Sequence, residues 1–147
     1  MASIDESMRL ERHEHLSLDE SIFKISLNLT RYYSRQRNLL RPAYLLGDAE
    51  IYDRAAALIR HATQRIGAIV RHKLGSEPSE TLDERVELAM RSVYTLLQQR
   101  MVFHQVSTGR FSPENDDAMA HELSALFKQI AGPFEGPARA VASRQRS

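Results

Sequence analysis

Seven polar-tipped side chains lie on or beside the apolar stripes of this sequence, and together they could line a ligand pocket. Each combines an apolar body with a polar tip, the mixture from which small-molecule pockets are built. Tyr94 and Gln98 are four residues apart, so on a helix a hydroxyl and an amide would lie side by side. Taken singly, each residue is typical of the edge of a core. As a group they form the predicted pocket: Tyr32, Tyr33, His61, Arg65, Tyr94, Gln98 and His104.

The histidines could in principle bind a metal, but their spacing argues against it. His13 and His15 are two residues apart, which on a helix directs the imidazoles to different sides. The other histidines are scattered, and no pair has the four-residue spacing of a helical metal site. The chain also has no cysteine, which excludes thiolate zinc and iron–sulfur sites. We therefore predict no metal and no cofactor.

Enzymatic motifs are missing from the sequence. It has no G-x-S-x-G element, no glycine-rich phosphate loop and no H-x-E…C-x-x-C deaminase signature. A di-iron bundle would need Glu-x-x-His repeats on two helices, and none is found. A small helical-bundle enzyme is the least favoured of the functions considered, and we predict that the protein is not an enzyme.

Long stretches rich in helix-forming residues must position these side chains, since glycine and proline interrupt the chain only sparsely. A helix should begin at the capping box SLDE, residues 17–20, and break near Arg37-Asn38. A short helix, Leu39–Leu46, should follow with Pro42 in its first turn and end at Gly47. The next helix should extend from a cap at Asp48 to Gly75.

Two further helices are predicted, over residues 82–106 and 113–131. The first should begin at the capping box TLDE, residues 81–84, and it carries apolar residues on more than one face. Such a helix must be covered from two sides. The second should be capped by Ser112, with Pro113 in its first turn, and stop before Gly132-Pro133. No stretch alternates with a period of two, so the predicted fold is an all-α antiparallel bundle.

Length and composition fit one ordinary helical domain. The 147 residues carry 20 basic and 19 acidic side chains, and a net charge of +1 gives no field to attract nucleic acid or an anionic membrane. The N-terminus lacks the apolar core of a signal peptide, and no apolar stretch reaches the length of a membrane span, so a cytoplasmic protein is expected. We divide the chain into an arm or remnant of a connecting helix (1–15), a helical domain (16–132) and a tail expected to be disordered (133–147).

Several segments resemble the C-terminal domain of the TetR family of transcriptional regulators. They are LSLDESI (16–22), YYSRQRNLLR (32–41), the stretch from DERVELAM (83–90) through QQRMVF (98–103), and ELSALF (122–127). The resemblance covers residues 16–132. Members of the family begin with a helix-turn-helix head that binds DNA, and these 147 residues show no such head. The resemblance therefore implies effector binding and dimerisation for this chain, and no DNA contact of its own.

In this family the last two helices of each subunit form a four-helix interface, which implies a homodimer through helices 82–106 and 113–131. The doubly apolar helix 82–106 points the same way, although its second face could instead pack on the chain's own first helices. A specific interface would bury about 1,600 Å². The predicted interface residues are Val93, Leu97, Arg100, Met101, Met119, Leu123, Leu126, Phe127 and Ile130.

The resemblance further implies that a small, largely apolar effector shifts the relative placement of two DNA-binding heads. The seven pocket residues named above would then bind that effector. The alternative from another class is a stand-alone helical dimer that binds a protein partner or a small molecule without regulating transcription.

Overall fold

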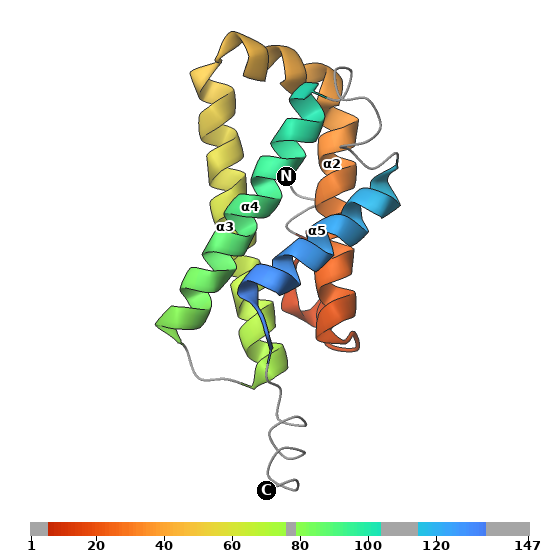
Figure 1. Ribbon diagram of the computed structural model, residues 1–147, viewed down its shortest axis with the longest axis vertical. Coiled ribbons are helices and arrows are strands. Elements are labelled where there is room, and N and C mark those ends of the chain that lie inside the picture. Colours follow the sequence, from red (N-terminus) through yellow and green to blue (C-terminus); the bar gives the residue numbers. More distant parts are fainter. Residues whose placement is uncertain (1–5, 76–78, 104–114, 135–147) are drawn as a thin grey trace, which may run out of the picture.

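The protein is an all-α bundle, which confirms the predicted fold class (Figure 1). The computed structural model describes residues 6–75, 79–103 and 115–134, without the side chains of residues 101–103. Within these ranges there is no strand, and no helix is long and apolar enough to cross a membrane. The elements are a 3₁₀ turn η1 (Leu10–His13) and the helices α2 (Leu18–Leu46), α3 (Ala49–Leu74), α4 (Glu80–Phe103) and α5 (Asp116–Ala131).

Local capping signals set most helix ends. The Ser17 hydroxyl accepts a hydrogen bond from the Glu20 backbone N–H at 3.1 Å, and the Glu20 carboxylate accepts one from the Ser17 N–H at 2.9 Å, so the predicted capping box is confirmed. Asp48 caps α3 as expected. Gly47 and Gly75 end α2 and α3 with φ values of 69° and 60°, a left-handed conformation that favours glycine.

The predicted break near Arg37-Asn38 is wrong, because α2 continues as one helix to Leu46. Pro42 lies inside it and cannot donate a hydrogen bond to the Asn38 carbonyl. A proline inside a helix bends it, and the C-terminal part of α2 turns across the end of the bundle toward α3 (Figure 1). This bend creates the space described below as the candidate site.

The starts of α4 and α5 also differ from expectation. Helix α4 begins at Glu80, where the Ser79 hydroxyl accepts a hydrogen bond from the Leu82 N–H, so Ser79 and not Thr81 is the cap. The side chain of Asn115 caps α5 by accepting from the Ala118 N–H at 2.8 Å, and the helix therefore starts at Asp116. The proposed cap at residues 112–113 and the predicted extension of α4 over 104–106 lie outside the described residues.

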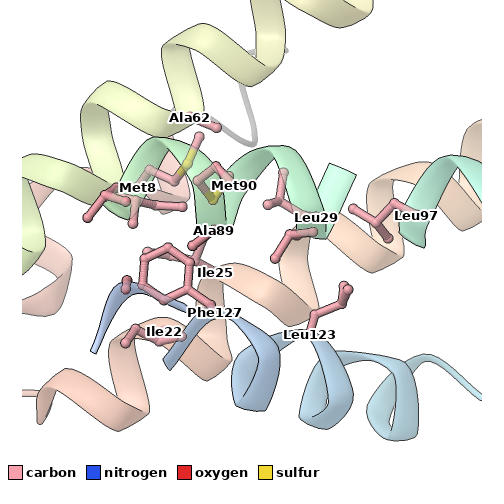
Figure 2. Packing of buried hydrophobic residues seen from close by; sticks show 14 of the residues in the cluster. Met8, Ile22, Ile25, Leu29, Ala62, Ala89, Met90, Leu97, Leu123 and Phe127 are labelled. Carbon is pink, nitrogen blue, oxygen red and sulfur yellow. The ribbon is translucent and has the colours of Figure 1, made fainter. Parts of the chain in front are cut away.

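Helix α4 lies at the centre of the bundle and packs against α2, α3 and α5. In Figure 2 its side chains lie between Ala62 of α3 on one side and Leu123 and Phe127 of α5 on the other. Both of its apolar faces are consequently covered by helices of the same chain. The α4 residues Val86, Ala89, Met90, Val93 and Leu97 are each at most 2% exposed.

The N-terminal segment is docked on the bundle through a buried histidine. His13 is 1% exposed and its Nε2 donates to the Ser7 carbonyl at 2.8 Å, while its buried Nδ1 finds no hydrogen-bond partner in the part of the chain that the structure describes. Lys73 of α3 donates to the carbonyls of Glu14 and Leu16. Burial lowers the pKa of His13 from its ordinary value of 6.5, against the raising effect of the Ser7 hydrogen bond, and the positive charges of Lys24, Lys73 and His15 lower it further.

We expect His13 to make the protein less stable in mild acid. As the pH falls below 6.5, His13 becomes protonated in the unfolded chain but stays neutral in the folded chain. The free energy of unfolding therefore decreases with falling pH, by at most about 1.4 kcal/mol per pH unit, until the lowered pKa of folded His13 is reached. Urea unfolding at pH 7 and pH 5 should show a smaller loss for His13→Gln than for the parent. His72→Gln, at an exposed position on α3 whose charge is not among those acting on His13, is the control and should show the same loss as the parent. Equal losses for parent and His13→Gln would contradict the prediction.

Candidate functional site

A cavity of about 400 Å³ opens between the C-terminal half of α2 and the first half of α3. The residues that line it come from the parts of α2 and α3 on either side of the bend that Figure 1 shows in α2. Its volume falls within the range of small-molecule sites, about 300–1,000 Å³. Most of its surface is apolar, and the residues that line it are Tyr32, Tyr33, Gln36, Leu39, Leu40, Tyr44, Ile51, Arg54, Ala55, Ala57 and Leu58.

All five tyrosines of the chain gather at this cavity and form what we call the tyrosine cluster: Tyr32, Tyr33, Tyr44, Tyr52 and Tyr94. The rings of Tyr32 and Tyr33 meet edge to face, with centroids 5.6 Å apart, and those of Tyr44 and Tyr52 do the same at 5.2 Å. The hydroxyls of Tyr44 and Tyr94 share a hydrogen bond of 3.1 Å, which connects the cavity wall to α4. Tyr52 donates to the Tyr44 carbonyl at 2.9 Å, which connects the wall across the α2–α3 turn.

Two tyrosines of the wall, Tyr33 and Tyr44, stay uncharged at physiological pH. Burial raises the pKa of Tyr33, and the neighbouring tyrosines Tyr94 and Tyr32 raise it further. Burial and the hydrogen bond with Tyr94 raise the pKa of Tyr44 in the same way. Tyr33 is 4% exposed, and its hydroxyl has no hydrogen-bond partner among the described residues. This part of the wall is therefore neutral, with one hydroxyl whose bonding capacity is unused.

Removing these two hydroxyls should have opposite effects on stability. Tyr33→Phe deletes a buried unbonded hydroxyl and should raise the free energy of unfolding by about 1 kcal/mol. Tyr44→Phe breaks the bond to Tyr94 and leaves that hydroxyl without its partner, so it should lower the free energy by about 1 kcal/mol. Paired urea titrations measure the difference. Equal losses for the two variants would mean that the Tyr33 hydroxyl is bonded after all.

The structure brings together only part of the predicted pocket. Tyr32 and Tyr33 line the cavity. Tyr94 does not line it but forms a hydrogen bond with Tyr44, which does. Three predicted residues are not among those that line it, namely His61, Arg65 and Gln98. His104 lies outside the described residues.

Sequence reasoning missed Tyr44, Tyr52 and Arg54. The break predicted in α2 assigned Tyr44 to a separate short helix. Tyr52 and Arg54 lie on the correctly predicted α3, but without the bend of α2 nothing indicated that they lie near Tyr44. The tyrosines on either side of the Gly47 turn were the available signal. Tyr44 and Tyr52 are eight residues apart, and the turn folds one ring against the other.

Five of the predicted interface residues belong to the chain's own core. Val93, Leu97, Met119, Leu123 and Phe127 are each at most 3% exposed, so they are not available to a second chain. Their assignment to an interface is corrected here. The reason is that α2, α3 and α5 already cover both apolar faces of α4.

The remaining interface candidates divide between α4 and α5. The Arg100 side chain is 9% exposed and donates to Asp116 and to the Asn115 carbonyl. Leu126 and Ile130 are half-buried on α5. The side chain of Met101 lies outside the description. An interface through these helices would have to use their outward faces, where Leu88 of α4 is 50% exposed.

Metal ligands and comparisons with known proteins give no further information about this site. The described residues contain no group of three or more histidine, aspartate or glutamate side chains that could hold a metal ion. Comparison of the chain with protein-family models, with curated proteins and with solved structures found no match.

Proposed function

We propose that this chain is the ligand-binding and dimerisation domain of a TetR-like transcriptional regulator, and that its cavity binds a small, largely apolar effector. The cavity carries the proposal, because its volume and its mainly apolar wall with a few polar groups are those of a small-molecule site. DNA contact would come from a helix-turn-helix head of the family type, which is not among these residues. The sequence resemblance over residues 16–132 supports the same assignment.

The position of the cavity suggests how an effector would act at a distance. Helix α2 is a single helix of 29 residues, equivalent to about 43 Å of helix axis if straight. One end of it follows the docked N-terminal segment, and the other end forms the cavity wall. A ligand that binds more tightly to one bent form of α2 than to another would shift the equilibrium between these forms, and with it the relative placement of the two ends of α2. The N-terminal end of α2 is therefore where the signal would leave this domain.

A ligand screen by thermal unfolding tests the proposal. An effector that binds only the folded chain should stabilise it by about 2.7 kcal/mol at one hundred times its Kd. Ala57 lines the cavity and is exposed, so Ala57→Phe should fill the mouth of the cavity and remove the stabilisation. Ala56→Phe changes the neighbouring exposed residue, which does not line the cavity, and should leave the stabilisation intact. If the two variants respond alike to every ligand that binds, the cavity is not the site.

One observation favours the second candidate, a stand-alone helical dimer, in its form that binds a protein partner. Leu39, Leu45 and Leu46, in the bent part of α2, are 66%, 61% and 85% exposed. Exposed apolar residues on one segment are typical of a protein contact surface. Leu45→Ser with Leu46→Ser would leave small-molecule binding unchanged and abolish capture of a protein partner, which separates the two candidates.

A further inference from the structure

The charges around the cavity indicate which small molecules it would take. Among the residues that line it, Arg54 is the only one with a charged side chain, and no carboxylate is present. Gln36 adds an amide that can donate hydrogen bonds. Tyr33 and Tyr44 stay neutral, so they do not repel an anion. A cationic ligand would find no carboxylate among the lining residues, and the adjacent Glu50 is already paired with Arg54, whereas an acidic ligand would find the Arg54 guanidinium.

Arg54 is held at the rim by an ion pair that a ligand can replace. Its Nη2 lies 2.6 Å from the Glu50 carboxylate, and both side chains are more than 70% exposed. Exposed pairs of this kind contribute little to stability, because water solvates both charges when they separate. The carboxylate of a ligand bound in the cavity could therefore take the place of Glu50 at little cost. A bidentate pair between a guanidinium and a carboxylate also fixes the orientation of the ligand.

The walls favour a flat, aromatic body. The rings of Tyr32, Tyr33 and Tyr44 form much of the wall, and aromatic pairs are more favourable than their buried area alone accounts for. Leu39 and Ile51 complete an apolar surface. The volume of about 400 Å³ is at the lower end of the range for ligand sites, which suits a molecule of one or two rings.

From this arrangement we infer that the cavity selects a one- or two-ring aromatic carboxylate, with its rings among the tyrosines and its carboxylate on Arg54 and Gln36. The inference rests on the proposed function, because it names the ligand class of the same cavity.

Calorimetric titration with three probes that share one ring system tests the inference: 2-naphthoate, 2-naphthamide and 2-naphthylmethylammonium. At low ionic strength the carboxylate should bind about tenfold more tightly than the amide, and the ammonium most weakly. Added salt should reduce the advantage of the carboxylate.

Variants of the ion pair locate the effect. Arg54→Gln should abolish the preference for carboxylate over amide and leave the amide affinity unchanged. Arg91→Gln is the matched control, since Arg91 forms a similarly exposed pair with Glu87 on α4, and it should retain the preference. Glu50→Gln should tighten naphthoate binding, because Arg54 then has no competing carboxylate.

The outcomes distinguish the ligand class from the function. If the amide binds, Ala57→Phe blocks it, and the carboxylate has no advantage in the parent or in Glu50→Gln, the inferred class is overturned and the proposed function stands. If the ammonium binds as tightly as the carboxylate, the inferred class is likewise overturned. If none of the three probes binds the folded chain, the inferred class is overturned, and the proposed function is then decided by the ligand screen with Ala57→Phe and Ala56→Phe.

Discussion

Leu97→Glu is expected to unfold the protein, not merely to separate two subunits. Leu97 is 2% exposed in the core of a single chain. Truncating such a leucine to alanine costs about 2–5 kcal/mol, and a glutamate adds an unpaired buried charge. The sum approaches the whole stability of a typical domain, about 5–15 kcal/mol. Far-UV circular dichroism with urea titration should show a largely unfolded chain in water.

Leu88→Glu is the control on the same helix. Leu88 is 50% exposed, so its replacement should change the free energy of unfolding by no more than about 0.5 kcal/mol. Sedimentation of this folded variant also measures whether the outward face of α4 forms a contact between two chains. A Leu97→Glu protein that remained fully folded but became monomeric would contradict the burial of Leu97 in the core of one chain and would place Leu97 at a contact between two chains.

Asp116→Ala should lower the free energy of unfolding by about 2 kcal/mol. One oxygen of Asp116 accepts hydrogen bonds from the Ser34 hydroxyl at 2.8 Å and from Arg100 at 3.3 Å, so α2, α4 and α5 meet at this carboxylate. The Arg100 side chain is 9% exposed, and burial lowers its pKa while Asp116 opposes that shift. Without Asp116, a largely buried guanidinium loses its counter-ion, which costs more than the loss of a surface ion pair.

Asp117→Ala separates this contact from the general effect of an acid near a helix N-terminus. Asp117 is exposed in the same first turn of α5, so both variants lose a similar interaction with the helix dipole. Chemical unfolding should show a loss at Asp117 of well under half that at Asp116. Equal losses would indicate that Arg100 and Ser34 gain nothing from Asp116.

The helix ends that sequence reasoning predicted correctly are those decided by local chemistry. Ser17 and Glu20 are three residues apart and satisfy each other's backbone groups, whatever the rest of the chain does. Gly47 and Gly75 end their helices because glycine adopts a positive φ at no steric cost. Such signals need only neighbouring residues, and the sequence contains them in full.

Features that depend on tertiary packing could not be predicted in this way. Pro42 is compatible with a helix start and with a bend, and packing of the bundle decides between them. The two apolar faces of α4 show that it must be covered twice, but periodicity does not tell whether the second cover comes from α3 or from another chain. The cavity depends on the bend of α2, so Tyr44 and Arg54 could not be assigned to it from spacing alone.

The most direct test of the account is to locate a bound aromatic ligand by NMR of labelled tyrosine and phenylalanine rings. The chain has five tyrosines and no tryptophan, and all five belong to the tyrosine cluster, so each ring signal reports on this region. On titration with 2-naphthoate, we predict shifts in the ring signals of Tyr32, Tyr33 and Tyr44, which line the cavity. The ring signal of Phe127 should not shift, because Phe127 lies in the hydrophobic core and does not line the cavity. Saturable binding that shifts Phe127 while the tyrosine signals stay in place would contradict the account.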